Sequence, residues 1–297
     1  MSDMRKLNKC ISVFFLNLLL ILLISGCSPN GDTPTSPITV TNNLTTPSFD
    51  PTHERHPYQD IVNAVKALQP TEIPEHLLSY NCNRTFEEFD VNEYFTILTN
   101  ISVKEGYTLD YVYCFDNSAG YPTFYIRKLS QKPYLNELEL YEETGLLQAG
   151  IDRNIELQKN IMSGETLAWR NSIVINDTKQ GFFEYLVLHI IGGQFYLWWH
   201  AGYNDLTFIC DHSALQAVIE EVQKYYGMSE ETISAAYKLD LSPEVEFKDH
   251  YVIITAVFFT SWGGFREGTF TISHDFPHIV INTEWKTLVE YDCGAVI

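Results

Sequence analysis

The 297-residue chain has few basic residues. It contains 19 lysines and arginines against 38 aspartates and glutamates, which gives a formal charge of −19. Nucleic-acid binding and flat contact with an anionic bilayer both need a basic surface, so this balance argues against both. The acidic charge permits cationic ligands or divalent metals, although acidity is also a common means of keeping a protein soluble.

Common catalytic motifs are absent as well. There is no Gly-x-Ser-x-Gly elbow, no His-Glu-x-x-His and no phosphate-binding Gly-Lys-Ser/Thr. Acidic pairs such as Glu142-Glu143 fit solvated helix faces better than the two separated carboxylates of a glycosidase. These absences favour a binding protein over an enzyme, and no cofactor is expected.

The N-terminal apolar run is too short for a permanent membrane helix. It extends from Cys10 to Ile24, with Ser12 and Asn17 as interruptions. These 15 residues fall short of the roughly 20 that cross a bilayer. Basic residues precede the run and small residues follow it, which is the secretory pattern. An uncleaved N-terminal membrane anchor is the alternative.

Residues 24–27 read Ile-Ser-Gly-Cys directly after this run. Together with the basic start, the segment resembles the signal peptide and lipobox of a bacterial lipoprotein precursor. The resemblance implies that residues 1–26 are removed and that Cys27 carries diacylglycerol and an N-acyl chain such as palmitate. Each buried CH₂ contributes about 0.8 kcal/mol. The chain would then be exported and held in the cell envelope: in the outer membrane if the organism has one, otherwise on the outer face of the cell membrane.

The mature chain divides into a tether and a folded part. Residues 27–52 are rich in Pro, Thr, Ser and Asn, a composition typical of an extended spacer. Without residues 1–26 the chain keeps 16 basic and 37 acidic residues, a formal charge of −21. Residues 53–297 suffice for one large domain or for two similar α+β units that meet near 160–165.

The predicted helices share apolar residues at helical spacing. They cover 58–68, 87–98, 211–226 and 229–237, while 146–161 is either a helix or an irregular connection. Ser213 and Gln216 are expected to form a capping box at the start of the third of these helices.

The predicted strands have alternating or uniformly apolar residues between turn signals. They cover 107–114, 122–129, 166–175, 181–191, 194–200, 206–210, 245–259, 268–274 and 278–289. Gly192-Gly193 are expected to join two of them in a two-residue hairpin, since glycine tolerates positive φ. Successive strands with tight turns predict an α+β fold, an antiparallel sheet with helices packed on one face.

Four cysteines lie in the part predicted to be exported. An even number outside the cytoplasm permits two disulfides in three connectivities. The pairs Cys82–Cys114 and Cys210–Cys293 keep each bridge within one half of the chain and are preferred over the other connectivities. Four buried free thiols are the alternative. The spacings match no zinc knuckle.

Two aromatic loops are the main candidate site. On a strand, Trp198 and Trp199 face opposite sides, so only one of them can lie in the core. Trp262 stands in a glycine-rich turn, where exposing an indole is costly without a purpose. The alternative for the first loop is a helix that covers the second face of the strand, and the alternative for Trp262 is a ring that folds back over the edge of the sheet. If the loops meet at one end of the sheet, the expected ligand-binding residues are Trp199, His200, Tyr203, Asp205, Trp262 and Arg266.

A weaker metal candidate lies further along the chain. His274, Asp275 and His278 place two imidazoles and a carboxylate within five residues. Pro277 prevents the helical geometry that aligns such ligands, and no third strong ligand is indicated. His189, in a very apolar segment, is expected to be a core histidine with its hydrogen bonds satisfied.

The sequence thus predicts a membrane-anchored envelope lipoprotein that contacts the lipid bilayer through acylated Cys27. Its aromatic loops would bind a small molecule, a glycan or a protein. One alternative is an extracytoplasmic hydrolase acting on envelope or environmental polymer, with convergent acids in a pocket. Another is a structural scaffold whose aromatic surface docks a second envelope protein.

Overall fold

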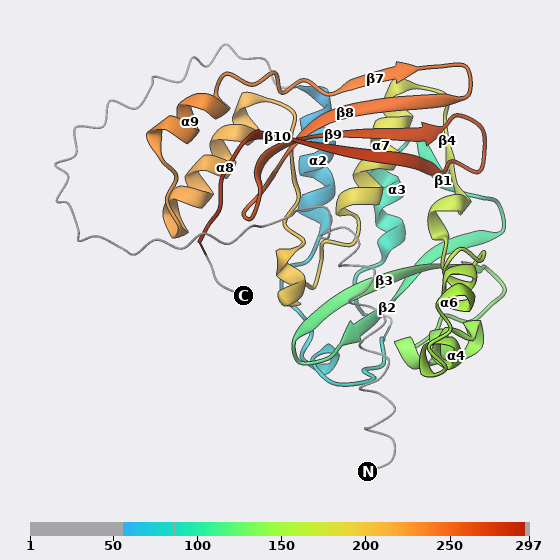
Figure 1. The fold of residues 1–297 in the computed structure, drawn as a ribbon. Helices are drawn as coiled ribbons and strands as arrows, with labels where there is room; N and C mark the ends of the chain where they lie inside the picture. Colours follow the sequence, from blue (N-terminus) through green and yellow to red (C-terminus); the bar gives the residue numbers. More distant parts are fainter. Residues whose placement is uncertain (1–55, 86, 295–297) are drawn as a thin grey trace.

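The computed structural model describes residues 56–85 and 87–294, and Figure 1 draws their arrangement. The predicted signal peptide, Cys27 and the tether at 27–52 lie outside the described residues. Within those ranges, no helix combines the length and the apolar content that crossing a membrane requires. Helices and antiparallel sheets make up the structure, so the α+β class that the sequence predicts is confirmed.

Eight α-helices occur in the described part of the chain, and most of them are short. They are α2 (Pro57–Leu68), α3 (Tyr94–Ile97), α4 (Glu137–Thr144), α5 (Leu146–Ile151), α6 (Ile155–Met162), α7 (Lys179–Ile191), α8 (His212–Tyr225) and α9 (Glu230–Ala236). Asp211 rather than Ser213 caps α8, because Asp211 Oδ1 accepts a hydrogen bond from the Ala214 amide at 2.9 Å.

The strands of the described part form three antiparallel sheets. They are β1 (Ile101–Val103), β2 (Tyr107–Phe115), β3 (Ala119–Lys128), β4 (Ile173–Ile175), β5 (Trp198–Trp199), β6 (Thr207–Ile209), β7 (Glu244–Phe247), β8 (Tyr251–Thr260), β9 (Gly264–Ser273) and β10 (Val280–Val289). The largest sheet has the order β10-β9-β8-β6, with β7 also paired to β8. The second sheet is β2-β3-β5, and β1 pairs with β4 in the third.

One core joins the layers. Figure 1 shows α2 and α7 between the largest sheet and the β2-β3 pair. Val62 of α2, Tyr111 of β2, Leu186 of α7 and Ile254 of β8 all belong to a single buried cluster. Burying each such aliphatic side chain contributes about 1.5–3 kcal/mol. Residues from both sides of 160–165, the boundary of the two-unit alternative, belong to this cluster, and the β1-β4 pair crosses that point.

Helices cover both faces of the largest sheet, one layer more than the sequence predicts. Neighbouring residues of a strand point to opposite faces. Phe258 of β8 lies in the central cluster, whereas Val257 and Phe259 pack with Leu215 of α8 and Ala236 of α9. The amphipathic helix α8 therefore covers an apolar strip of its own on the outer face of the sheet.

The predicted strand at 181–191 is wrong, because this segment is helix α7. Residues 181–188 are all buried, so the helix has no polar face to reveal its period. Thr178 caps it by accepting a hydrogen bond from the Gly181 amide at 2.9 Å. Gly192 has a φ of −55°, in the right-handed helical region, so the predicted glycine hairpin is absent.

Three other segments also differ from the predicted elements. The single strand predicted at 245–259 is the hairpin of β7 and β8, closed where the Lys248 amide donates to the Tyr251 carbonyl at 2.8 Å. Only the last three residues of 166–175 form a strand, after a 3₁₀ turn. The helix predicted at 87–98 is reduced to a 3₁₀ turn and the four residues of α3.

Neither predicted disulfide is present in the described part of the chain, where all four cysteines are free. Cys82 lies in the central cluster, with Sγ 3.6 Å from the Tyr113 carbonyl. Cys114 follows Tyr113 on β2 and so points to the opposite face of the sheet, where it packs in the cluster that includes Leu140 of α4. The sheet therefore lies between these two thiols. Cys210 is buried in the central cluster, and Cys293 is half-buried beyond the end of β10.

Candidate functional site

Four aromatic side chains from two distant loops form a continuous row, which we call the aromatic ladder: Trp199, His200, Tyr203 and Trp262. Trp199 stacks on His200, with ring centroids 4.8 Å apart and an interplanar angle of 14°. His200 meets Tyr203 at 5.2 Å, and Tyr203 meets Trp262 edge-on at 5.3 Å. The structure thus brings together the two loops that the sequence singles out.

The end of the β2-β3 hairpin holds the first loop in place. β5 pairs with the start of β3, where Gly120 lies opposite Trp198. A Cβ on Gly120 would lie 2.5 Å from the Tyr113 hydroxyl and 2.9 Å from the Trp198 Cβ, so a larger residue would clash. The Tyr113 hydroxyl also donates to the Tyr196 carbonyl at 2.6 Å. Close packing on Gly120 and the hydrogen bond from Tyr113 therefore hold this loop in place.

Trp199 is held exposed in a strained conformation. Its side chain is 63% exposed, and its backbone has φ +44° and ψ −113°. A bulky residue rarely adopts positive φ, and such strain costs about 1–3 kcal/mol. Trp198 is 38% exposed, so neither indole enters the core. Strained residues cluster at functional sites, which makes this loop the leading candidate.

Asp205 joins the two loops instead of facing a ligand. Its Oδ1 accepts a hydrogen bond from the Thr260 hydroxyl at 2.5 Å. Its Oδ2 accepts from the Ser261 amide at 2.6 Å, one residue before Trp262. The carboxylate therefore fixes the turn between β8 and β9, and so the position of the Trp262 end of the aromatic ladder.

Arg266 borders the aromatic ladder along its own strand. Its Nη1 lies 3.9 Å from where a Gly263 Cβ would stand, beside Trp262. Its guanidinium carbon lies 5.2 Å from the Trp285 ring centroid, a cation–π contact. Its Nε is buried without a hydrogen-bond partner. Of the six predicted ligand-binding residues, four form the ladder, Asp205 braces it and Arg266 lies at its edge.

The weaker metal candidate does not gather a ligand set. His274 Nε2 pairs with Asp177 Oδ1 at 2.8 Å, whereas His278 is buried with Nδ1 3.3 Å from the Ser273 carbonyl. Burial lowers the pKa of His278. Among residues 56–85 and 87–294, no three His, Cys, Asp or Glu side chains are placed to hold a metal ion.

His189 differs from the expectation of a satisfied core histidine. It lies on α7, where its ring stacks on Tyr185 at 6.3 Å. Its Nδ1 is buried without a partner. Burial, with a smaller effect of Arg170, holds the pKa of His189 well below its usual value.

The residues that support the ladder could not be found from the sequence. Gly120 and Tyr113 lie about 80 residues before the loop that they hold, and only the register of β5 on β3 reveals their contact. The one sequence signal is a glycine after the Asp116–Ala119 turn, and glycine is common near turns. No protein-family model, curated protein or solved structure matches this chain.

Proposed function

We propose that this chain is an exported lipoprotein, anchored in the cell envelope through Cys27, whose folded part binds a glycan chain on the aromatic ladder. The likeness of residues 1–27 to a lipoprotein signal supports the address. The composition of residues 27–52 supports a spacer that holds the folded part away from the bilayer.

The exposed indole of Trp199 is the observation on which the proposal depends. A binding-neutral loop would relax its backbone or bury the ring, since an exposed ring in a strained loop gains nothing from folding alone. Here the ring stays exposed, supported on one side by His200. This arrangement presents a flat apolar face to solvent.

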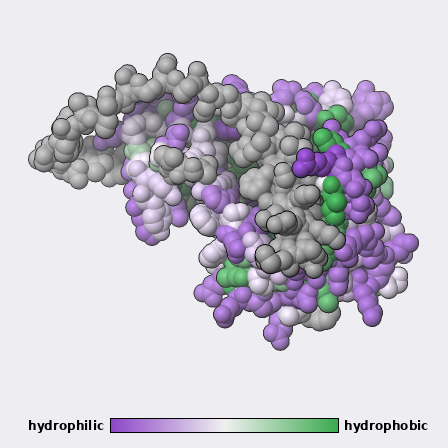
Figure 2. Space-filling model, turned by 60° about the horizontal axis from the view of Figure 1, so that its bottom comes forward, coloured by the Kyte–Doolittle hydropathy of each residue, from purple (hydrophilic) through white to green (hydrophobic). Residues whose placement is uncertain are grey.

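Sugar rings suit such a surface because they combine flat C–H faces with hydroxyl groups at the edges. The ladder offers indole and phenol faces for stacking, and Arg266 and the Tyr203 hydroxyl for hydrogen bonds. Figure 2 shows that hydrophilic residues cover most of the visible described surface, with hydrophobic residues in small separate patches.

The test is a pull-down with insoluble peptidoglycan, chitin and cellulose, followed by an array of soluble glycans. We expect one of these probes to retain the purified full chain, and Trp199→Ala to weaken retention at least about fivefold. Tyr225→Ala is the matched control, because Tyr225 on α8 is 60% exposed and lies outside the ladder.

Blank results with every glycan would refute glycan binding. If Trp199→Ala instead releases a co-purifying envelope protein, the scaffold alternative replaces the glycan proposal.

Mass spectrometry of the native protein tests the anchor separately, with Cys27 as the expected first residue carrying a diacylglyceryl group. An intact Met1 would exclude that anchor while leaving the binding result interpretable.

A further inference from the structure

A hollow of about 560 Å³ lies between the end of β3 and helix α4, and none of the residues that line it belongs to the aromatic ladder. The volume falls within the range of small-molecule sites. The residues that matter for its chemistry are Arg127, Gln131, Lys132, Tyr134, Glu139 and Glu143.

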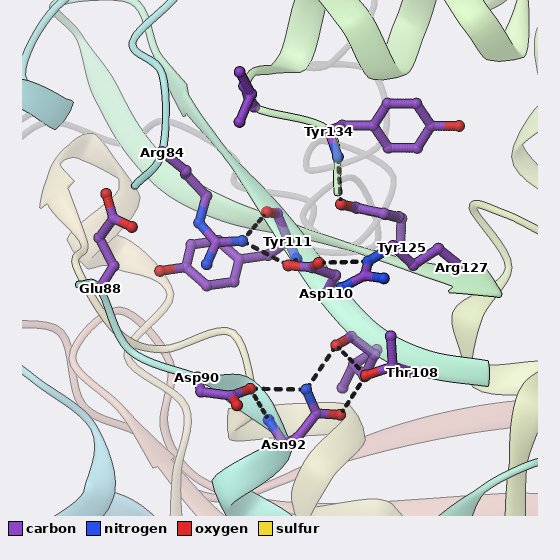
Figure 3. Close-up of polar contacts among 12 residues, drawn as sticks. Arg84, Glu88, Asp90, Asn92, Thr108, Asp110, Tyr111, Tyr125, Arg127 and Tyr134 are labelled. Atoms are coloured by element: carbon purple, nitrogen blue, oxygen red, sulfur yellow. Dashed lines mark hydrogen bonds and ion pairs between the residues drawn. The ribbon is translucent and has the colours of Figure 1, made fainter. Parts of the chain in front are cut away.

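The wall of the hollow is backed by two arginines that share one carboxylate (Figure 3). Arg84 Nη1 lies 2.6 Å from Asp110 Oδ1, and Arg127 Nε lies 2.8 Å from Asp110 Oδ2. The nearby Glu88 carboxylate binds His76 and the Thr85 amide instead. Within the triad of Arg84, Asp110 and Arg127, two guanidinium groups share the single carboxylate of Asp110, and Glu88 beside Arg84 remains a second acidic neighbour.

The same contacts orient Arg127 toward the hollow. Its side chain is only 19% exposed, and its Nη1 donates to the Gln131 carbonyl at 2.8 Å. Because Nε and Nη1 are both engaged, the guanidinium is fixed before any ligand arrives. Lys132 follows on the rim, exposed and without an ion pair in the described part of the chain.

One flat face in the hollow is also fixed. The Tyr134 amide donates to the Tyr125 hydroxyl at 2.9 Å, and the two rings meet edge-on at 5.0 Å. Figure 3 shows this contact beside the arginine triad. The Tyr134 ring is therefore a rigid platform on which a small ligand can lie.

The opposite side of the hollow carries acids. Glu139 and Glu143 lie one turn apart on α4 and so share a face of the helix. Glu139 Oε2 accepts a hydrogen bond from the Leu135 amide at 2.8 Å, and Glu143 is hydrogen-bonded to the Tyr134 side chain. Each carboxylate has further lone pairs that can accept from a ligand donor.

We propose that this hollow binds a small molecule that carries a carboxylate together with amine or hydroxyl donors, the chemistry that amino acids and acidic sugars share. The carboxylate would pair with Arg127 and Lys132, the donors with Glu139 and Glu143, and the body would lie on Tyr134. Arg127 and Lys132, the two basic residues of the lining, favour the anionic group. The acids oppose a ligand that is only anionic.

The test is calorimetric titration of the purified full chain with L-glutamate, L-alanine, D-glucuronate and N-acetylmuramate, beside neutral N-acetylglucosamine. We expect at least one carboxylate probe to bind and the neutral sugar to bind at least about tenfold more weakly. Binding of the amino acids alone or of the sugar acids alone would identify the source. The proposal is overturned if no carboxylate probe binds at millimolar concentration.

Two exposed lysines provide a matched pair of variants. Lys132→Ala removes a rim charge without touching the buried triad, and we expect it to weaken binding of the carboxylate probe about fivefold. Lys179→Ala makes the same charge change at the start of α7, outside the hollow, and should leave binding unchanged. Equal effects of the two variants would show that only overall charge matters, and would overturn the site. Trp199→Ala, which tests the aromatic ladder, should leave this titration unchanged.

Discussion

At the scale of single residues, His189 links the packing of α7 to pH. Its imidazole stacks on Tyr185 and is too buried to be protonated easily. The pKa in the folded state is well below the ordinary value of 6.5. As pH falls through 6.5, the histidine of the unfolded chain takes up a proton, whereas the buried histidine of the folded chain does not. The contribution of His189 to stability is therefore present at neutral pH and lost on acidification.

We expect the free energy of unfolding to fall between pH 7 and pH 5.5, with His189 contributing about 1 kcal/mol of the change. His189→Phe keeps a ring against Tyr185 and removes the titrating group, so the variant should lose that part of the dependence. Urea titrations at both pH values measure it. The comparison variant is His200→Phe, which makes the same substitution at the half-buried histidine of the aromatic ladder. Identical pH dependence in the wild type and His189→Phe would contradict the assignment.

The sequence could identify the ladder residues but not all their roles. An indole in a glycine-rich turn and a Trp-Trp pair are unusual enough to be noticed, and Trp262 and Trp199 both take part in the aromatic ladder. Asp205 was expected beside them as a ligand group, yet its carboxylate is occupied by the β8-β9 turn. Nothing in a local pattern shows that a loop 55 residues further on will supply its donors.

At the scale of elements, α7 shows where periodicity fails. A helix buried on all sides has no polar face, so its sequence resembles that of a buried strand. Length was the better guide, because the 13 residues of α7 exceed an ordinary strand. The amphipathic helices α2 and α8, which each have a solvent face, were predicted nearly residue for residue.

The β8-β9 hairpin depends on Asp205 for the geometry of its turn. In Asp205→Asn one acceptor becomes an amide donor that faces either the Ser261 amide or the Thr260 hydroxyl. We expect a loss of about 1–3 kcal/mol in the free energy of unfolding. Trp262 should also become more exposed to solvent, seen as a red shift in its fluorescence emission in a variant in which the other tryptophans are replaced by Phe.

The comparison variant is Asp249→Asn, in the exposed turn between β7 and β8. It removes the same charge from a hairpin turn of the same sheet. If the two variants are equally stable, the hydrogen bonds that Asp205 accepts do not hold the turn, and the alignment of the aromatic ladder would need another explanation.

At the scale of the whole molecule, the two halves of the chain depend on each other. The sequence allowed two similar units because each half has helices and a hairpin, and composition alone cannot show which apolar faces meet. The structure places Tyr111 of the first half and Ile254 of the second in one cluster. Helices α2 and α7, one from each half, pack side by side within it. A division near 160–165 would cut through this core.

We therefore expect neither fragment 56–162 nor fragment 163–294 to fold alone. The first would lack the strand β4 that pairs with β1 and the helix α7 that covers α2. The second would expose the face of α7 that α2 and β1 bury. Circular dichroism and urea unfolding should show one cooperative transition for the full chain and none for either fragment. A dispersed NMR spectrum from either fragment would mean that the shared cluster is an interface between two domains. Such an interface would allow the halves to move relative to each other, whereas a shared core fixes the aromatic ladder and the hollow beside α4 in one rigid body.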